Sequence, residues 1–65
     1  MTHETTLNIP AARVGDYVTG FGHGPSKIVR RYWDGWTWCY ELENGAIIEN
    51  NEVTLDNLLL ESEVL

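Results

Sequence analysis

The sequence is poor in the features that small domains use for covalent or metal-based stabilisation. Cys39 is the only cysteine among 65 residues, so no disulfide can form within the chain. Together with His3 and His23 it offers too few and too widely spaced ligands for a zinc site. A single thiol without a secretory signal is typical of a reducing compartment. We therefore expect a cytoplasmic protein with no metal and no other cofactor.

The chain also lacks long apolar runs and has few basic residues. No segment approaches the roughly 18 apolar residues that cross a bilayer, so we expect no membrane partner. Ten acidic residues oppose four basic ones, which gives a net charge of −6, and residues 41–65 hold no Lys or Arg. This acidic half repels phosphates and anionic lipids and favours basic protein surfaces. The simpler alternative is a solvated acidic surface that keeps a small domain soluble.

The clearest pattern present lies between residues 27 and 49. Three segments rich in β-branched and aromatic residues are separated by Asp34-Gly35 and by Asn44-Gly45. Both dipeptides favour two-residue type I′ turns, because both central residues of such a turn need a positive φ. Two such turns around a strand with a period of two predict a three-stranded antiparallel meander over residues 27–49.

Two-residue turns also fix which residues face each other across the meander. They predict that Trp33 lies opposite Trp36 and that Leu42 lies opposite Ile47. One face is then the predicted core, made of Val29, Trp36, Trp38, Tyr40, Leu42 and Ile47. The other face is predicted to be mixed and more exposed, and it carries Ile28, Arg30, Tyr32, Thr37, Cys39, Glu41, Glu43 and Ile48.

The segments on either side of the meander are less distinctive. We expect residues 1–12 to form a flexible arm and residues 13–65 to form a single small β-barrel domain. Residues 20–26 are dense in turn formers and are expected to form a loop. For residues 54–63 two alternatives stay open, a closing strand or a short helix capped by Thr54.

The order of strand, glycine-rich loop, two tight hairpins and short closing element is the order expected of an SH3-like barrel. The stretches VGDYVTGFGHGPSKIV (residues 14–29) and YELENGAIIENNEVTL (residues 40–55) carry a more specific likeness. They resemble the Tudor-like modules of RNA-polymerase-interacting transcription factors and of some helicase C-termini. The resemblance implies a mostly β, small SH3-like (Tudor-like) antiparallel barrel that docks onto a larger machine.

Aromatic residues around the first turn are the best functional candidates, because Tyr and Trp supply rigid contact area. Tyr32 and Trp33 flank the turn, where burial is hardest, whereas Trp36, Trp38 and Tyr40 could instead fill the core. The predicted binding surface joins this turn to the acidic edge and consists of Tyr32, Trp33, Trp36, Glu41, Glu43, Glu49 and Glu52.

No catalytic constellation is evident in the sequence. The glycines at positions 20, 22 and 24 lack the helix and the lysine-serine pair of a phosphate-binding loop. Cys39 has no neighbouring base that would activate it as a nucleophile. We therefore expect that the protein is not an enzyme.

The leading hypothesis is a non-catalytic, acidic protein-interaction module. It would be a small adaptor or inhibitor that binds a larger host protein, as many phage and prophage proteins do. The protein partner would have a basic or mixed surface and could belong to a nucleic-acid-processing machine. The alternative is a nucleic-acid- or transcription-machinery-associated SH3-like module that uses Lys27, Arg30, Arg31 and the aromatic cluster. A third hypothesis is a homodimer closed by leucines between residues 58 and 65.

Overall fold

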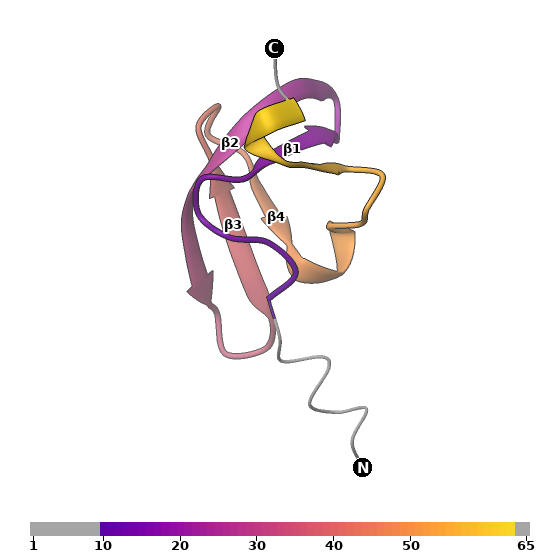
Figure 1. Ribbon diagram of the computed structural model, residues 1–65. Helices are drawn as coiled ribbons and strands as arrows, with labels where there is room; N and C mark the ends of the chain where they lie inside the picture. Colours follow the sequence, from indigo (N-terminus) through magenta and orange to yellow (C-terminus); the bar gives the residue numbers. More distant parts are fainter. Residues whose placement is uncertain (1–9, 64–65) are drawn as a thin grey trace.

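The computed structural model describes residues 10–63 and folds them into one open antiparallel sheet (Figure 1). The elements, in chain order, are β1 (Tyr17–Gly20), β2 (His23–Trp33), β3 (Trp38–Leu42), β4 (Ile47–Glu49), the 3-10 helix η1 (Asn50–Glu52), β5 (Leu58–Leu59) and the 3-10 helix η2 (Glu61–Glu63). The strand order across the sheet is β4-β3-β2-β1-β5. The prediction of a mostly β protein is thereby confirmed. None of the helices in the described part of the chain is long and apolar enough to cross a membrane.

Strand β2 is long enough to pair with two partners in succession. Its first half pairs with β1, where Val18 lies opposite Ser26, and its second half pairs with β3. Figure 1 shows the consequence: the far end of the β2–β3 hairpin extends beyond the part of the sheet that β1 and β5 form. This projecting end carries Trp33, Trp36 and Trp38.

Residues 20–26 form a hairpin rather than the predicted loop. Gly20 pairs with His23, so that only Phe21 and Gly22 connect β1 to β2. Both have a positive φ, 55° and 80°, as a type I′ turn requires. The turn formers at 24–26 lie inside β2, and Ser26 is buried there.

The predicted meander over residues 27–49 is confirmed, because β2, β3 and β4 are successive antiparallel strands. Its first turn differs from the prediction. Trp33 pairs with Trp38 and not with Trp36, so that four residues connect β2 to β3. A type I′ turn needs a positive φ at both centres, and here Gly35 has one (102°) while Asp34 does not.

The second turn is also longer than predicted, and the register there is wrong by one residue. Glu41, not Leu42, pairs with Ile47. The Leu42 N–H donates to the Ala46 carbonyl at 2.8 Å, so the hairpin loop consists of residues 43–45, with Gly45 at a φ of 94°, which is the usual form of a three-residue hairpin loop. A one-residue shift moves every side chain to the other face. Ile48 is therefore buried, whereas Ile47 is exposed.

A bulge at Val29 overturns the prediction for the start of the meander. Ile28 pairs with Leu42 and Arg30 pairs with Glu41, which leaves Val29 as the extra residue. Such a bulge interrupts the alternation of faces along a strand. Ile28 is consequently fully buried and Val29 is exposed, the reverse of the prediction.

The predicted core is right for Tyr40 and Leu42, which are fully buried, and Trp38 packs against them half-buried. It is wrong for three exposed residues, Val29, Trp36 and Ile47. Three residues predicted on the mixed, more exposed face are buried instead, Ile28, Cys39 and Ile48. The core cluster consists of Ala12, Val18, Ile28, Tyr40, Leu42, Ile48 and Val53.

Residues 10–12, the end of the predicted arm, lie against the sheet. The backbone N–H of Ala11 donates to the Tyr40 hydroxyl (2.9 Å) and to Asn50 Oδ1 (2.8 Å). The N–H of Ala12 reaches the same hydroxyl at 3.3 Å, and that hydroxyl donates to Asn50 Oδ1. A buried tyrosine needs such partners, because an unpaired hydroxyl is costly to bury. The rest of the predicted arm, residues 1–9, lies outside the described residues.

Of the two alternatives for the C-terminal segment, the closing strand is present. The carbonyl of Thr54 accepts hydrogen bonds from Asn57 and Leu58 and forms a turn, after which Leu58 and Leu59 pair with β1. Helix η2 follows this strand. Leu58 packs on the core and Leu60 is exposed, while Leu65 lies outside the described residues. A homodimer built on these leucines stays a prediction.

Candidate functional site

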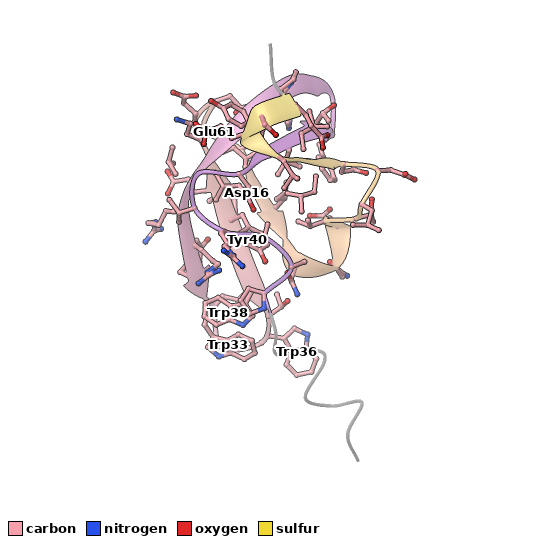
Figure 2. The ribbon with its side chains drawn as sticks, viewed as in Figure 1. Asp16, Trp33, Trp36, Trp38, Tyr40 and Glu61 are labelled. Carbon is pink, nitrogen blue, oxygen red and sulfur yellow. The ribbon has the colours of Figure 1, made fainter. Side chains whose placement is uncertain are left out.

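Three tryptophans meet at the projecting end of the β2–β3 hairpin (Figure 2). We call Trp33, Trp36 and Trp38 the tryptophan tip. The exposed fraction is 86% for Trp36 and 43% for Trp33, and Trp38 is half-buried. Large exposed aromatic residues that cluster in this way commonly mark interaction sites. The tip is therefore the first candidate surface of the described chain.

The loop that carries Trp36 is held by a single carboxylate. Asp34 Oδ1 accepts hydrogen bonds from the backbone N–H groups of Trp36 and Thr37, both at 2.8 Å. These bonds, led by the one from Thr37, hold the pKa of Asp34 below its ordinary value of 3.8. The Asp34 N–H donates in turn to the Thr37 carbonyl at 3.1 Å. The exposed indole thus stands on a loop with a defined backbone.

The other two rings of the tip support each other and an arginine. Trp33 and Trp38 are cross-strand partners, and their rings meet edge to face with centroids 5.7 Å apart. The Arg31 guanidinium lies over the Trp38 ring at 5.4 Å and donates from Nη1 to the Ala12 carbonyl at 2.9 Å. Arg31 therefore joins the tip to the segment that covers the core.

A different group of predicted site residues lies on the opposite face of the hairpin. Arg30 stacks on the Tyr32 ring at 4.4 Å and pairs with Glu41 at 3.0 Å. Glu49 lies one strand further, opposite Cys39. With the exposed Ile47, these residues form what we call the outer face. Because side chains alternate along a strand, Tyr32 and Trp33 point to opposite sides of the sheet.

The structure thus divides the seven predicted binding residues among four places. The tip holds Trp33 and Trp36, and the outer face holds Tyr32, Glu41 and Glu49. Glu43 is in the β3–β4 loop, at the other end of β3 from the tip. Glu52 ends η1, where its Oε1 accepts the Glu49 N–H at 2.7 Å. This bond gives Glu52 a capping role within the fold.

Cys39 is buried beneath the outer face and is poorly suited to chemistry. Its thiol donates to Asp34 Oδ2 at 3.4 Å. Burial raises the pKa of the Cys39 thiol above its ordinary value of 9.0, and the neighbouring Asp34 raises it further. A protonated, buried thiol is a weak nucleophile. Within residues 10–63, no three His, Cys, Asp or Glu side chains lie close enough to hold a metal ion.

A groove of about 570 Å³ lies beside the tip, where the N-terminal segment crosses the sheet. Residues 10–13 line it together with Asp16, Arg31 and Leu60. Sequence reasoning missed the groove, because its residues come from three distant segments. The one available indication was the pair Arg13 and Arg31, two of only four basic residues in an acidic chain.

The basic residues proposed for nucleic-acid contact do not form one surface. Lys27 lies over the Tyr17 ring at 5.5 Å, in the part of β2 that pairs with β1. Arg30 is on the outer face and is paired with Glu41, whereas Arg31 is on the side of the tip. A nucleic-acid site needs cations gathered along one path, and these three lie on separate parts of the sheet.

Comparison with known proteins gives no further assignment. No family model, no curated protein and no solved structure matches this chain significantly.

Proposed function

We propose that this chain is a non-catalytic protein-binding module, a small adaptor or inhibitor, with an SH3-like barrel architecture. It binds its partner through the tryptophan tip, while the outer face contributes a secondary acidic contact.

The connectivity supports the SH3-like assignment. The order expected of such barrels is a strand, a glycine-rich loop, two tight hairpins and a short closing element. Here η1 lies between β4 and β5, and β5 pairs with β1 through Tyr17–Leu59 and Val18–Leu58. The long, bulged β2 serves both halves of the sheet.

The observation that carries the proposed function is the exposure of Trp36. An indole that is 86% exposed adds almost nothing to the core, yet its loop is fixed by two backbone hydrogen bonds to Asp34. Binding loses less conformational entropy when the loop that carries an aromatic contact group is already ordered. Trp33, held against Trp38, extends the same apolar surface.

The outer face supports a partner with a basic or mixed surface. Glu41 and Glu49 lie there beside the exposed Ile47, and Arg30 neutralises part of the charge of Glu41. Exposed ion pairs of this kind contribute only about 0–1 kcal/mol to stability. Their charges are therefore available for steering a partner more than for holding the fold.

Affinity capture with matched variants tests this proposal. The immobilised full chain, its Trp36→Ala variant and a Leu55→Ala control are incubated with lysate of the source cells, and bound proteins are identified by mass spectrometry. Leu55 is 91% exposed, so the control removes an equally exposed apolar side chain elsewhere. We expect a protein that the wild type and Leu55→Ala retain and that Trp36→Ala loses.

Equal retention of every captured protein by Trp36→Ala would contradict the tip as the binding surface. The nucleic-acid alternative is tested alongside with a single-stranded oligonucleotide at about 50 mM salt, where phosphate contacts are strongest. Tight, salt-dependent binding of the oligonucleotide would favour that alternative instead.

A further inference from the structure

The groove beside the tryptophan tip has a charge opposite to that of the chain as a whole. We propose that it binds a peptide segment of the partner that carries a carboxylate next to an apolar side chain. This inference rests on the proposed function, because it assumes a protein partner. It adds a contact in which the partner supplies the negative charge, whereas on the outer face this chain supplies it.

Two arginines that line the groove, Arg13 and Arg31, have no carboxylate partner among the described residues. Among residues 10–63, the ion pair present is that of Arg30 with Glu41, and neither Arg13 nor Arg31 has a carboxylate partner there. Acids outnumber bases ten to four in this chain, so partners are plentiful. Two cations without a carboxylate partner nevertheless line the same groove. Charge complementarity therefore favours an anionic group as the occupant.

Arg31 is held in a position that suits a carboxylate. Its Nη1 donates to the Ala12 carbonyl, and its guanidinium plane lies near the Trp38 ring. A guanidinium has five N–H donors in a rigid fork, so one hydrogen bond to Ala12 leaves donors for a two-point contact with a carboxylate. Because the side chain is already ordered, binding requires little further loss of rotamer freedom.

Asp16 is the one carboxylate among the groove residues, and it is already engaged. Its Oδ2 accepts the backbone N–H of Arg13 at 3.0 Å. The groove is thus lined by two arginines and one aspartate, against a net charge of −6 for the chain. The positive excess is local, and it suits one or two negative charges rather than an extended polyanion.

Because the positive charge is confined to the groove, the groove suits a peptide better than a nucleic acid. A strand of nucleic acid continues past the groove and places phosphates near acids such as Glu61 and Glu63, which follow directly after the groove residue Leu60. Charges interact appreciably within about 8–10 Å at moderate salt. A single peptide carboxylate held in the groove that Arg13 and Arg31 line avoids most of that repulsion.

The groove also offers an apolar surface for the apolar side chain of the proposed ligand. Pro10 and Leu60 line the groove, and Leu60 is 56% exposed. The groove volume lies within the range of about 300–1,000 Å³ that is usual for ligand sites. An aliphatic side chain next to the carboxylate would bury the exposed part of Leu60.

Titration with matched peptides tests the inference on the full chain. The probes are an acetylated, amidated Leu-Asp-Glu-Leu peptide and its neutral counterpart Leu-Asn-Gln-Leu, followed by amide and indole signals in NMR spectra. We expect the acidic peptide to shift the signals of Ala12, Arg31 and Trp38. Because a charge-assisted hydrogen bond is stronger than a neutral one, the neutral peptide should bind at least about fivefold more weakly.

Two variants assign the effect to the groove. Arg13→Gln should weaken the acidic peptide about fivefold, because it removes one exposed guanidinium and no hydrogen bond of the fold. Arg30→Gln is the matched control: it removes the same charge from the outer face, and we expect an unchanged affinity.

Several results would overturn the inference. These are no binding of the acidic peptide, equal affinity for both peptides, equal weakening by both variants, or shifts confined to Tyr32 and Ile47 on the outer face. An octathymidylate that binds the groove more tightly than the acidic peptide would also overturn it, in favour of a nucleic acid. All of these leave the Trp36-dependent capture of a partner intact, so failure of the groove is distinguishable from failure of the proposed function.

Discussion

The hairpin of β2 and β3 has a covered half and an uncovered half, and the two treat aromatic residues in opposite ways. Tyr40 is fully buried, and its hydroxyl bonds to Ala11, Ala12 and Asn50. Trp36, only four residues earlier, is 86% exposed. Residue type does not explain the contrast. What differs is coverage, because residues 10–12 and η1 fold over the half that contains Tyr40 and leave the tip uncovered.

The comparison indicates which half is available for binding. A chain of this size buries only about 60% of the surface that it exposes when unfolded, so it has little apolar area to spare. Two tryptophans exposed at this end, Trp33 and Trp36, are therefore unfavourable to leave there if they serve stability alone. The covered half maintains the fold, and the uncovered half presents the contact surface.

The largest expected effect on stability comes from a substitution in the core of the covered half. Tyr40→Ala removes a fully buried ring together with the hydroxyl that bonds to Ala11, Ala12 and Asn50. Truncation of a large buried aromatic side chain destabilises by about 3–5 kcal/mol. That approaches the whole stability of a small domain, so circular dichroism should show a chain that is largely unfolded at 25 °C. A folded variant with an unchanged melting curve would show that the core lies elsewhere.

A smaller loss of stability is expected when Gly35, in the loop of the tip, is replaced by alanine. Gly35 has a φ of 102°, and a Cβ there would meet no atom within 4 Å. Gly35→Ala should therefore act through backbone strain alone and destabilise by about 1–2 kcal/mol. Gly24→Ala, where φ is not positive, is the control and should be neutral. Urea denaturation measures both, and equal stability of the two variants would contradict the loop geometry.

Trp36→Ala should leave the stability within about 0.5 kcal/mol of the wild type, because the removed ring is almost fully exposed. The same urea experiment measures this effect. A loss above about 2 kcal/mol, as expected for a buried aromatic residue, would place Trp36 in the core and remove the contrast with Tyr40.

The smallest effect concerns pH. The pKa of Asp34 is lowered by its hydrogen bonds from Thr37 and Trp36, so the ionised form stabilises the loop. That stabilisation is complete above the ordinary value of 3.8 and is lost as pH falls through the lower folded value. The NMR signals of the Trp36 and Thr37 amides should therefore titrate below pH 3.8. In Asp34→Asn this titration should be absent.

The sequence predicted the strands of the meander but not their register. Asp34-Gly35 and Asn44-Gly45 correctly placed two turns, yet side-chain hydrogen bonds of Asp34 and the single positive φ at Gly45 made both turns longer than two residues. The type I′ geometry occurs instead at Phe21-Gly22, where no favoured dipeptide indicates it. The two residues added to the first turn shift the pairing by an even number and leave the faces unchanged, whereas the one-residue shift at the second turn and the Val29 bulge changed which side chains face the core.

The candidate site was predictable only in part. Exposure of Trp33 followed from its place beside the turn, whereas Trp36 was assigned to the core because a two-residue turn would have put it in the strand. The groove could not be predicted from the sequence. Residues 10–13, Arg31 and Leu60 line one groove only because of the way the N-terminal segment crosses the sheet. Local patterns do not encode such long-range coverage.

The most direct test of the account is a measurement of solvent access to the three tryptophans in one sample. The chain labelled with 5-fluorotryptophan gives separate ¹⁹F signals, assigned by single Trp→Phe variants, and a soluble gadolinium complex relaxes each in proportion to its exposure. We expect the strongest relaxation for Trp36, an intermediate value for Trp33 and the weakest for Trp38. Relaxation of Trp36 as weak as that of Trp38 would contradict the exposed tip and the function built on it.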